Sequence, residues 1–126
     1  MPIQTRIDPD NGFRVHVMEG PILMDEVRLT LEETYAHPDF RPEADAMWDL
    51  TGATGDPATE EIRHLADFVG KLAGEMDAGK VALLVSEQFE FGLARMYESI
   101  LAGQSSKPIM VFKNRAEAES WLSGDG

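Results

Sequence analysis

The sequence predicts an α/β protein with a mostly parallel, five-stranded sheet and flanking helices. Short apolar or alternating segments take turns with longer segments of helical periodicity, an order typical of parallel strands joined by crossover helices. Near the amino end, only a Pro-Asp-Asn-Gly stretch separates two alternating segments, which predicts a hairpin and hence an antiparallel edge. The expected order is ββαβαβαβα in a single domain over residues 1–126, with residues 124–126 as a flexible tail.

The first half of the chain supplies three of the expected strands and one helix. The segments "IQTRID" and "FRVHVME" form the hairpin, and a helix follows from Met24 to about Ala36, because Pro38 disfavours the helical conformation of the residue before it. A third strand is expected from Ala46 to Leu50, followed by a Gly-rich loop. Alternation along the second strand places Phe13, Val15 and Val17 on one face and Arg14, His16 and Met18 on the other.

The second half is expected to alternate helices and strands. A helix begins at Asp56 or Thr59 and ends at Gly79, and the apolar run "KVALLVSE" follows as a strand buried on both faces. The segment "FEFGLARMYESILAG" is a helix, and "KPIMVFK" is the last strand. Asn114 and Glu117 form a pair that resembles a capping box. The final helix that they start buries three apolar residues, Ala118, Trp121 and Leu122.

Composition and charge exclude several classes of function. The chain has 11 basic and 23 acidic residues and a net charge of −12, whereas nucleic acids and anionic membranes require clustered Lys and Arg. The longest apolar run, "VALLV", is far too short to span a bilayer, and the amino terminus lacks the apolar core of a signal peptide. The absence of cysteine excludes disulfides and thiolate metal sites. We therefore expect a cytoplasmic protein with no membrane span and no nucleic-acid partner.

The residues that could carry chemistry are expected at the carboxyl edge of the sheet. Right-handed crossovers between parallel strands place the loops that follow the strands on one edge, where open α/β sheets bind ligands. The polar residues expected at this edge are Glu19, Asp49, Thr51, Thr54, Ser86, Glu87, Lys113 and Asn114.

Two interpretations of Asp49 follow from its position at the end of a strand. With Thr51 it could orient a hydroxyl group or a water molecule for catalysis. The more common role for such a residue is to accept hydrogen bonds from its own loop, and we favour this role. The sequence has no Gly-x-Ser-x-Gly elbow, no nucleotide-binding glycine pattern and no His-x-x-x-His spacing. We therefore expect no catalytic residue, no cofactor and no metal.

Three stretches give the chain a resemblance to a known superfamily. They are "HPDFRPEADAMWDLT", "FGLARMYESIL" and "IMVFKNRAEAESWL", and their order and spacing extend the likeness from Met24 to Leu122. In these stretches the chain resembles the SpoIIAA-like, or STAS-like, superfamily. It is more closely similar to the bacterial branch described as STAS/SEC14-domain proteins. The resemblance implies a SpoIIAA-like fold.

The resemblance also implies a regulatory site that this chain has in altered form. Well-studied STAS members are anti-sigma-factor antagonists in which a strand ending Asp-Leu-Ser precedes a phosphorylated serine at the start of the next helix. Counted from Asp49, that position falls on about Pro57 or Ala58, neither of which can be phosphorylated. Thr54 and Thr59 are the nearest hydroxyl-bearing residues and the only phosphorylation candidates.

Three functions remain open on these grounds. The first is a non-enzymatic partner-binding or regulatory module, with a protein partner or a second copy of itself as a homodimer. The alternative is a carrier of a small apolar ligand or lipid, in a SEC14-like pocket that Met96 and Tyr97 help to line. The third is a hydrolase-type enzyme that uses Asp49 with Thr51 or Ser86. The candidate ligand- or partner-binding residues are Asp49, Thr51, Thr54, Ser86, Met96 and Tyr97.

Overall fold

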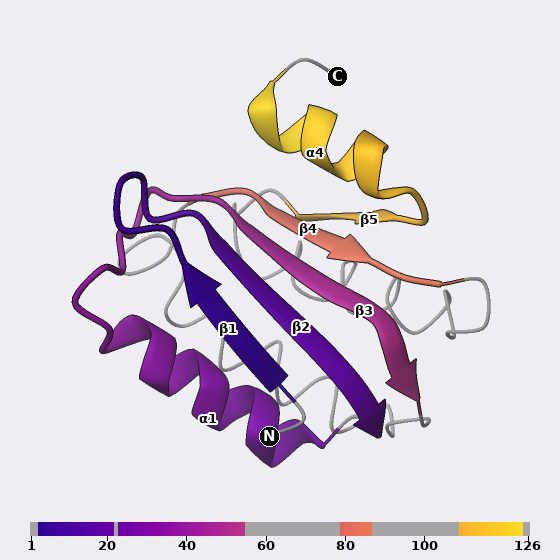
Figure 1. Cartoon of the computed structure of the whole chain (residues 1–126), viewed down its shortest axis with the longest axis horizontal. Coiled ribbons are helices and arrows are strands. Elements are labelled where there is room, and N and C mark those ends of the chain that lie inside the picture. The colour runs from indigo at the N-terminus through magenta and orange to yellow at the C-terminus, as the bar shows by residue number, and fades with distance from the viewer. Residues whose placement is uncertain (1–2, 22, 55–78, 87–108, 125–126) are drawn as a thin grey trace.

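The computed structural model describes residues 3–21, 23–54, 79–86 and 109–124 (Figure 1). Within these ranges the chain forms one five-stranded sheet with the strand order β1-β2-β3-β4-β5. β1 pairs antiparallel with β2, and every further pair is parallel. The strands are β1 (Ile3–Ile7), β2 (Arg14–Pro21), β3 (Ala46–Thr54), β4 (Val81–Leu84) and β5 (Ile109–Phe112).

This sheet confirms the predicted α/β class, with its mostly parallel strands and antiparallel amino-terminal edge. The helices predicted from Asp56 or Thr59 to Gly79 and over "FEFGLARMYESILAG" lie almost wholly outside the described residues. Of the helices in the described ranges, none is long and apolar enough to cross a membrane.

The predicted hairpin joins β1 to β2 through a tight turn. The backbone N–H of Asp8 donates to the carbonyl oxygen of Phe13 at 2.9 Å, and the N–H of Gly12 donates to the carbonyl oxygen of Asp8 at 2.7 Å. Gly12 has φ +78°, a conformation that side chains disfavour, so glycine is suited to this turn. The side chain of Asn11 accepts a further bond from the N–H of Phe13 at 2.8 Å. Local bonds therefore close the hairpin.

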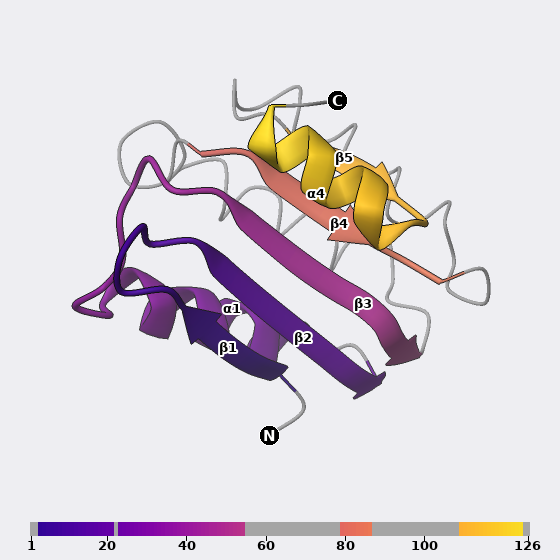
Figure 2. The same ribbon diagram turned by 45° about the horizontal axis from the view of Figure 1, so that its top comes forward.

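Two helices in the described ranges cover opposite faces of the sheet, as the turned view shows (Figure 2). Helix α1 (Met24–Tyr35) packs under the β1 side, and helix α4 (Arg115–Ser123) packs over β4 and β5. The helix predicted from Met24 is confirmed. The predicted cap of α4 is also present, because the Asn114 side chain accepts the N–H of Glu117 at 3.1 Å. Gly124 ends α4 in the left-handed conformation, with φ +84°.

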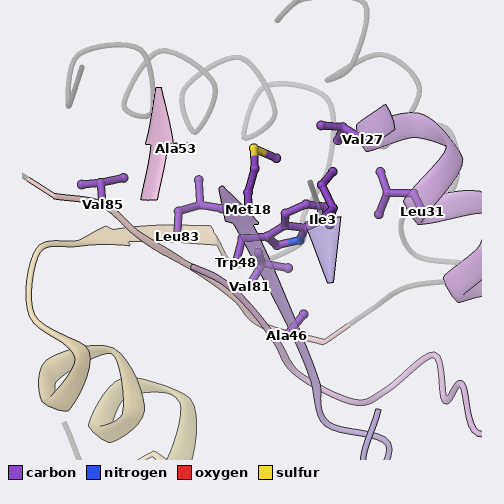
Figure 3. Close-up of a cluster of buried hydrophobic side chains, with 10 residues drawn as sticks. All are labelled: Ile3, Met18, Val27, Leu31, Ala46, Trp48, Ala53, Val81, Leu83 and Val85. Atoms are coloured by element: carbon purple, nitrogen blue, oxygen red, sulfur yellow. The ribbon is translucent and has the colours of Figure 1, made fainter. Parts of the chain in front are cut away.

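The larger hydrophobic cluster lies on the α1 side of the sheet (Figure 3). Alternate positions of the strands point to this side, and Val27 and Leu31 of α1 close over them. Arg14 and His16 of β2 lie opposite Ala46 and Trp48 of β3, which belong to this cluster. The two polar side chains therefore lie on the same face and are buried there. The buried members of the cluster are Ile3, Met18, Val27, Leu31, Ala46, Trp48, Ala53, Val81, Leu83 and Val85.

The cluster on the α4 side is smaller. Ala118 of α4 packs on Met47, Ala82 and Leu84, which are the intervening positions of β3 and β4. Four partly buried side chains surround this contact: Phe13, Phe112, Trp121 and Leu122. The predicted burial of the final helix is confirmed, with Ala118 fully buried and both other residues half-buried.

Strands β2 and β3 extend farther than the sequence predicted. The stretch after Leu50 was expected to be a loop, but β3 continues as a strand to Thr54. The reason is that β2 continues to Pro21 and pairs with this part of β3. Pro21 lies opposite Thr54, and the register shifts between Val17 and Glu19. Pairing of β3 with β4 stops earlier, at Asp49. The two extended strands therefore project beyond β4 as a pair, here called the β2–β3 projection (residues 19–21 and 50–54).

Gly79 lies just before β4 at the opposite, amino edge of the sheet. A Cβ atom at this position would overlap the carbonyl oxygen of Ala44, so the close approach of two backbones requires glycine here. The contact holds the segment before β4 against the segment before β3. Two hydrogen bonds support it, from the N–H of Ala46 to the carbonyl of Lys80 at 2.8 Å and from the N–H of Lys80 to Asp45 Oδ1 at 2.9 Å.

Candidate functional site

Asp49 lies on β3, on the face of the sheet that α4 covers, and only 8% of it is exposed. Its Oδ2 accepts a hydrogen bond from Nη2 of Arg115 at 2.5 Å, so the carboxylate and the guanidinium group also form an ion pair. Arg115 is the first residue of α4, and its Nη1 reaches the sulfur of Met47 at 3.4 Å. The start of α4 is therefore tied to the middle of the sheet through a single side chain.

The other carboxylate oxygen of Asp49 is bound to its own strand. Oδ1 accepts the backbone N–H of Thr51 at 3.0 Å and the Thr51 hydroxyl at 2.6 Å. The structure thus brings Asp49 and Thr51 together, and it does so in the way expected of an acid that accepts bonds from its own chain segment. With Arg115 on the second oxygen, three donors bind this carboxylate, which is the arrangement of a structural anchor.

The remaining predicted residues of this edge are dispersed. Thr54 is exposed at the end of β3, roughly 16 Å along the strand from Asp49 at about 3.3 Å per residue. Ser86 is half-buried two residues beyond Leu84, which is the β4 partner of Asp49. Glu19 is exposed on β2 opposite Gly52. Lys113 and Asn114 are exposed between β5 and α4, where the Asn114 side chain caps the helix. Four further candidates lie outside the described residues: Thr59, Glu87, Met96 and Tyr97.

Arg115 is the residue of this site that the sequence analysis missed. The signal was its place directly after the cap residue Asn114, in the first turn of a helix. A cation is unfavourable there because the helix dipole places partial positive charge at the amino end. A basic residue at such a position suggests an acidic partner from elsewhere in the fold, and Asp49 supplies it.

Two buried polar residues of β2 form a second polar arrangement, on the α1 side. His16 is fully buried, stacks on the Trp48 ring with centroids 4.2 Å apart, and its Nδ1 lies 2.9 Å from the Thr5 hydroxyl. Arg14 is 2% exposed and lies over the Phe40 ring at 5.0 Å. These contacts connect β2 to β1, to β3 and to the segment after α1. Within the described ranges, no three His, Asp or Glu residues form a group that could hold a metal ion.

The mixed five-stranded sheet with helices on both faces matches a SpoIIAA-like fold. The chain is similar to the crystal structure of an uncharacterized protein of the DUF3478 family, with a SpoIIAA-like fold, from Shewanella loihica PV-4. The TM-score is 0.60 at 17% sequence identity, and the match covers 95% of this chain and 91% of that one. No family model matches the chain, and no curated protein matches it. The predicted SpoIIAA-like fold is confirmed.

Proposed function

We propose that the chain is a non-enzymatic module that binds a protein partner at the carboxyl edge of its sheet, through the β2–β3 projection. The observation that carries this proposal is the bonding of Asp49, the acid that the sequence placed best for catalysis. Its carboxylate accepts bonds from Thr51 and Arg115, so it holds the middle of β3 and the start of α4 in position. A general base must reach a proton of its substrate, whereas Asp49 is only 8% exposed and directs Oδ1 to Thr51 and Oδ2 to Arg115.

The shape and exposure of the projection support the same proposal. Glu19, Thr51, Gly52 and Thr54 are exposed on two strands that extend past the last pairing with β4. Strand pairs that project from a rigid sheet present backbone and side-chain groups for recognition. In the STAS modules that this sequence resembles, the regulatory segment follows the equivalent strand, which supports the same location for a partner.

A pair of matched variants tests the proposal. Thr54→Arg adds one positive charge and a bulky side chain to the projection, and Leu29→Arg makes the same charge change at a half-exposed position on α1. The protein and both variants are purified gently from the native host and analysed by native mass spectrometry. We expect a stoichiometric protein partner, or a second copy, with the wild type and with Leu29→Arg, and its loss with Thr54→Arg.

Other outcomes of the same spectra would contradict or refine the proposal. A small apolar molecule that leaves on denaturation, without any protein partner, would favour the carrier function with Met96 and Tyr97 in its pocket. A phosphate-sized mass increment on Thr54 or Thr59 would show a covalent switch at this edge. A partner that is retained equally by both variants would place binding elsewhere on the molecule.

A further inference from the structure

A groove lies at the end of the molecule opposite to the projection, on the α4 side of the sheet. It has a volume of about 750 Å³ and runs between α4 and the segments that lead into β2 and β3. Helix α4 starts at Arg115, beside Asp49, and runs back toward the amino edge of the sheet. At about 1.5 Å per residue, its last residue lies roughly 12 Å from Arg115. The groove is lined by Asn11, Phe13, Glu43, Ala44, Asp45, Ala116, Glu119, Ser120, Leu122 and Ser123.

The lining combines apolar side chains with acidic ones on both sides. Phe13 and Leu122 are half-buried members of the α4-side cluster, so each leaves part of its apolar surface facing outward. Glu43 and Asp45 stand on the segment before β3, and Glu119 stands on α4 across the groove. Among the described residues that line the groove, none is Lys, Arg or His. A ligand in this groove would therefore meet negative charge from two walls and apolar surface between them.

The basic side chains described near the groove have other partners, and Arg41 donates through Nη2 to the carbonyl oxygen of Pro9 at 3.3 Å. Glu43 and Glu119 are exposed, and in the described part of the chain no hydrogen bond or ion pair involves either carboxylate. The ammonium group of Lys80 donates to the carbonyl oxygen of Trp121 at 3.0 Å and lies 5.4 Å from the Trp121 ring centre, so it is engaged at the end of α4. The last turn of α4 has no basic residue, and the carbonyl end of a helix carries partial negative charge.

We propose that this groove docks a cationic segment of a partner protein, one with Lys or Arg side chains beside an apolar anchor. The cations would pair with Glu43, Asp45 and Glu119, and the apolar anchor would pack on Phe13 and Leu122. The net charge of −12 would speed the encounter with such a segment. This inference rests on the proposed partner-binding function and adds a second surface with a defined chemistry.

The exposure of the walls favours a protein segment over a small amine. Small-molecule sites bury 70–90% or more of their ligand, typically among apolar side chains. Here Glu43, Ala116, Glu119 and Ser120 are all exposed, so a small cation would stay largely hydrated. A chain segment can instead distribute its contacts along the groove and add apolar contact at the floor.

Two matched double variants test the inference. Glu43→Lys/Glu119→Lys reverses the charge on both walls, and Glu32→Lys/Glu33→Lys makes the same charge change on exposed positions of α1, on the other face of the sheet. The probe is a fluorescent peptide of alternating Lys and Leu, titrated by anisotropy at low and moderate salt, with a Glu and Leu peptide and spermine as comparison ligands. Backbone NMR shift changes locate the bound peptide.

We expect the Lys and Leu peptide to bind the wild type and the α1 variant with Kd values within about threefold of each other. The groove variant should bind at least tenfold more weakly, and added salt should weaken all binding. Shift changes should include Phe13 and Leu122, and Thr54→Arg should leave this binding unchanged. Equal losses in both double variants, shift changes elsewhere, or spermine binding as tight as the peptide would overturn the proposal.

These results are separable from the test of the proposed function. Failure of the peptide to bind would remove the groove as a docking surface while leaving capture at the projection untouched. If Thr54→Arg and Leu29→Arg both retain the partner and the peptide binds specifically to the groove, the partner site would instead be the groove.

Discussion

Among the described residues, the α1 side of the sheet buries ten hydrophobic side chains in one cluster, whereas the α4 side buries four. The α1 side also buries Arg14 and His16, while the α4 side pairs the buried Asp49 with the half-exposed Arg115 and forms the open groove. The apolar area that each side removes from water differs accordingly. Of the described residues, those on the α1 side therefore contribute more to stability than those on the α4 side.

The two tryptophans, one on each side, allow the largest test of this difference. Trp48 is 9% exposed, belongs to the α1-side cluster and stacks on His16. Trp48→Ala should lower the free energy of unfolding by about 4 kcal/mol, because it removes a large buried ring and leaves a cavity. Urea unfolding followed by circular dichroism measures the change, and Trp48→Phe should recover more than half of it.

Trp121, the corresponding ring on the α4 side, should matter less. It is half-buried against Phe112, with ring centroids 5.7 Å apart, and its carbonyl rather than its ring binds Lys80 most closely. Trp121→Ala should cost about 2 kcal/mol in the same urea experiment. A loss equal to that of Trp48→Ala would contradict the assignment of stability mainly to the α1 side.

Local signals in the sequence predicted several parts of both sides. The Pro-Asp-Asn-Gly stretch identified the hairpin, because the turn needs a left-handed residue that Gly12 supplies. Asn114 and Glu117 identified the start of α4, because the cap bond joins residues three positions apart. The alternating order of strands and helices predicted the parallel sheet. Each of these features depends on residues close together in the chain.

The features that the sequence did not predict depend on distant partners. Alternation separated the two faces of β2, but only the neighbours of β2 decide that Arg14 and His16 are buried while Val15 and Val17 are half-buried. The extension of β3 to Thr54 required the matching extension of β2. The groove likewise joins the hairpin, the segment before β3 and α4, which are far apart in sequence.

The pair between Asp49 and Arg115 provides an intermediate test on the α4 side. Asp49→Ala removes the acceptor of Thr51 and Arg115, and should cost about 2 kcal/mol in unfolding free energy because Asp49 is mostly buried. Arg115→Ala should cost only about 1 kcal/mol, since the Arg115 side chain is 50% exposed and water screens it. Their double-mutant cycle should give a coupling of about 1 kcal/mol.

This cycle also separates anchoring from catalysis. If Asp49 acts only as an anchor, Asp49→Asn should retain its Thr51 contact in part and recover some stability relative to Asp49→Ala. A coupling near zero would show that Arg115 moves freely in solution and would reopen Asp49 as a group available to a ligand.

The smallest expected effect isolates the start of α4. Asn114→Ala removes the side-chain acceptor of the Glu117 N–H and should cost about 1 kcal/mol of unfolding free energy. Glu117→Ala is the matched control, because it keeps the backbone donor and loses only a favourable charge near the helix start, worth about 0.5 kcal/mol.

Since Arg115 is the first residue of this helix, Asn114→Ala should also reduce the coupling between Arg115 and Asp49. Hydrogen exchange should then accelerate in α4 while the amides of β2 and β3 beneath α1 keep their protection, because the larger cluster on that side does not involve α4. Equal acceleration on both sides would mean that the two faces of the sheet unfold as one unit.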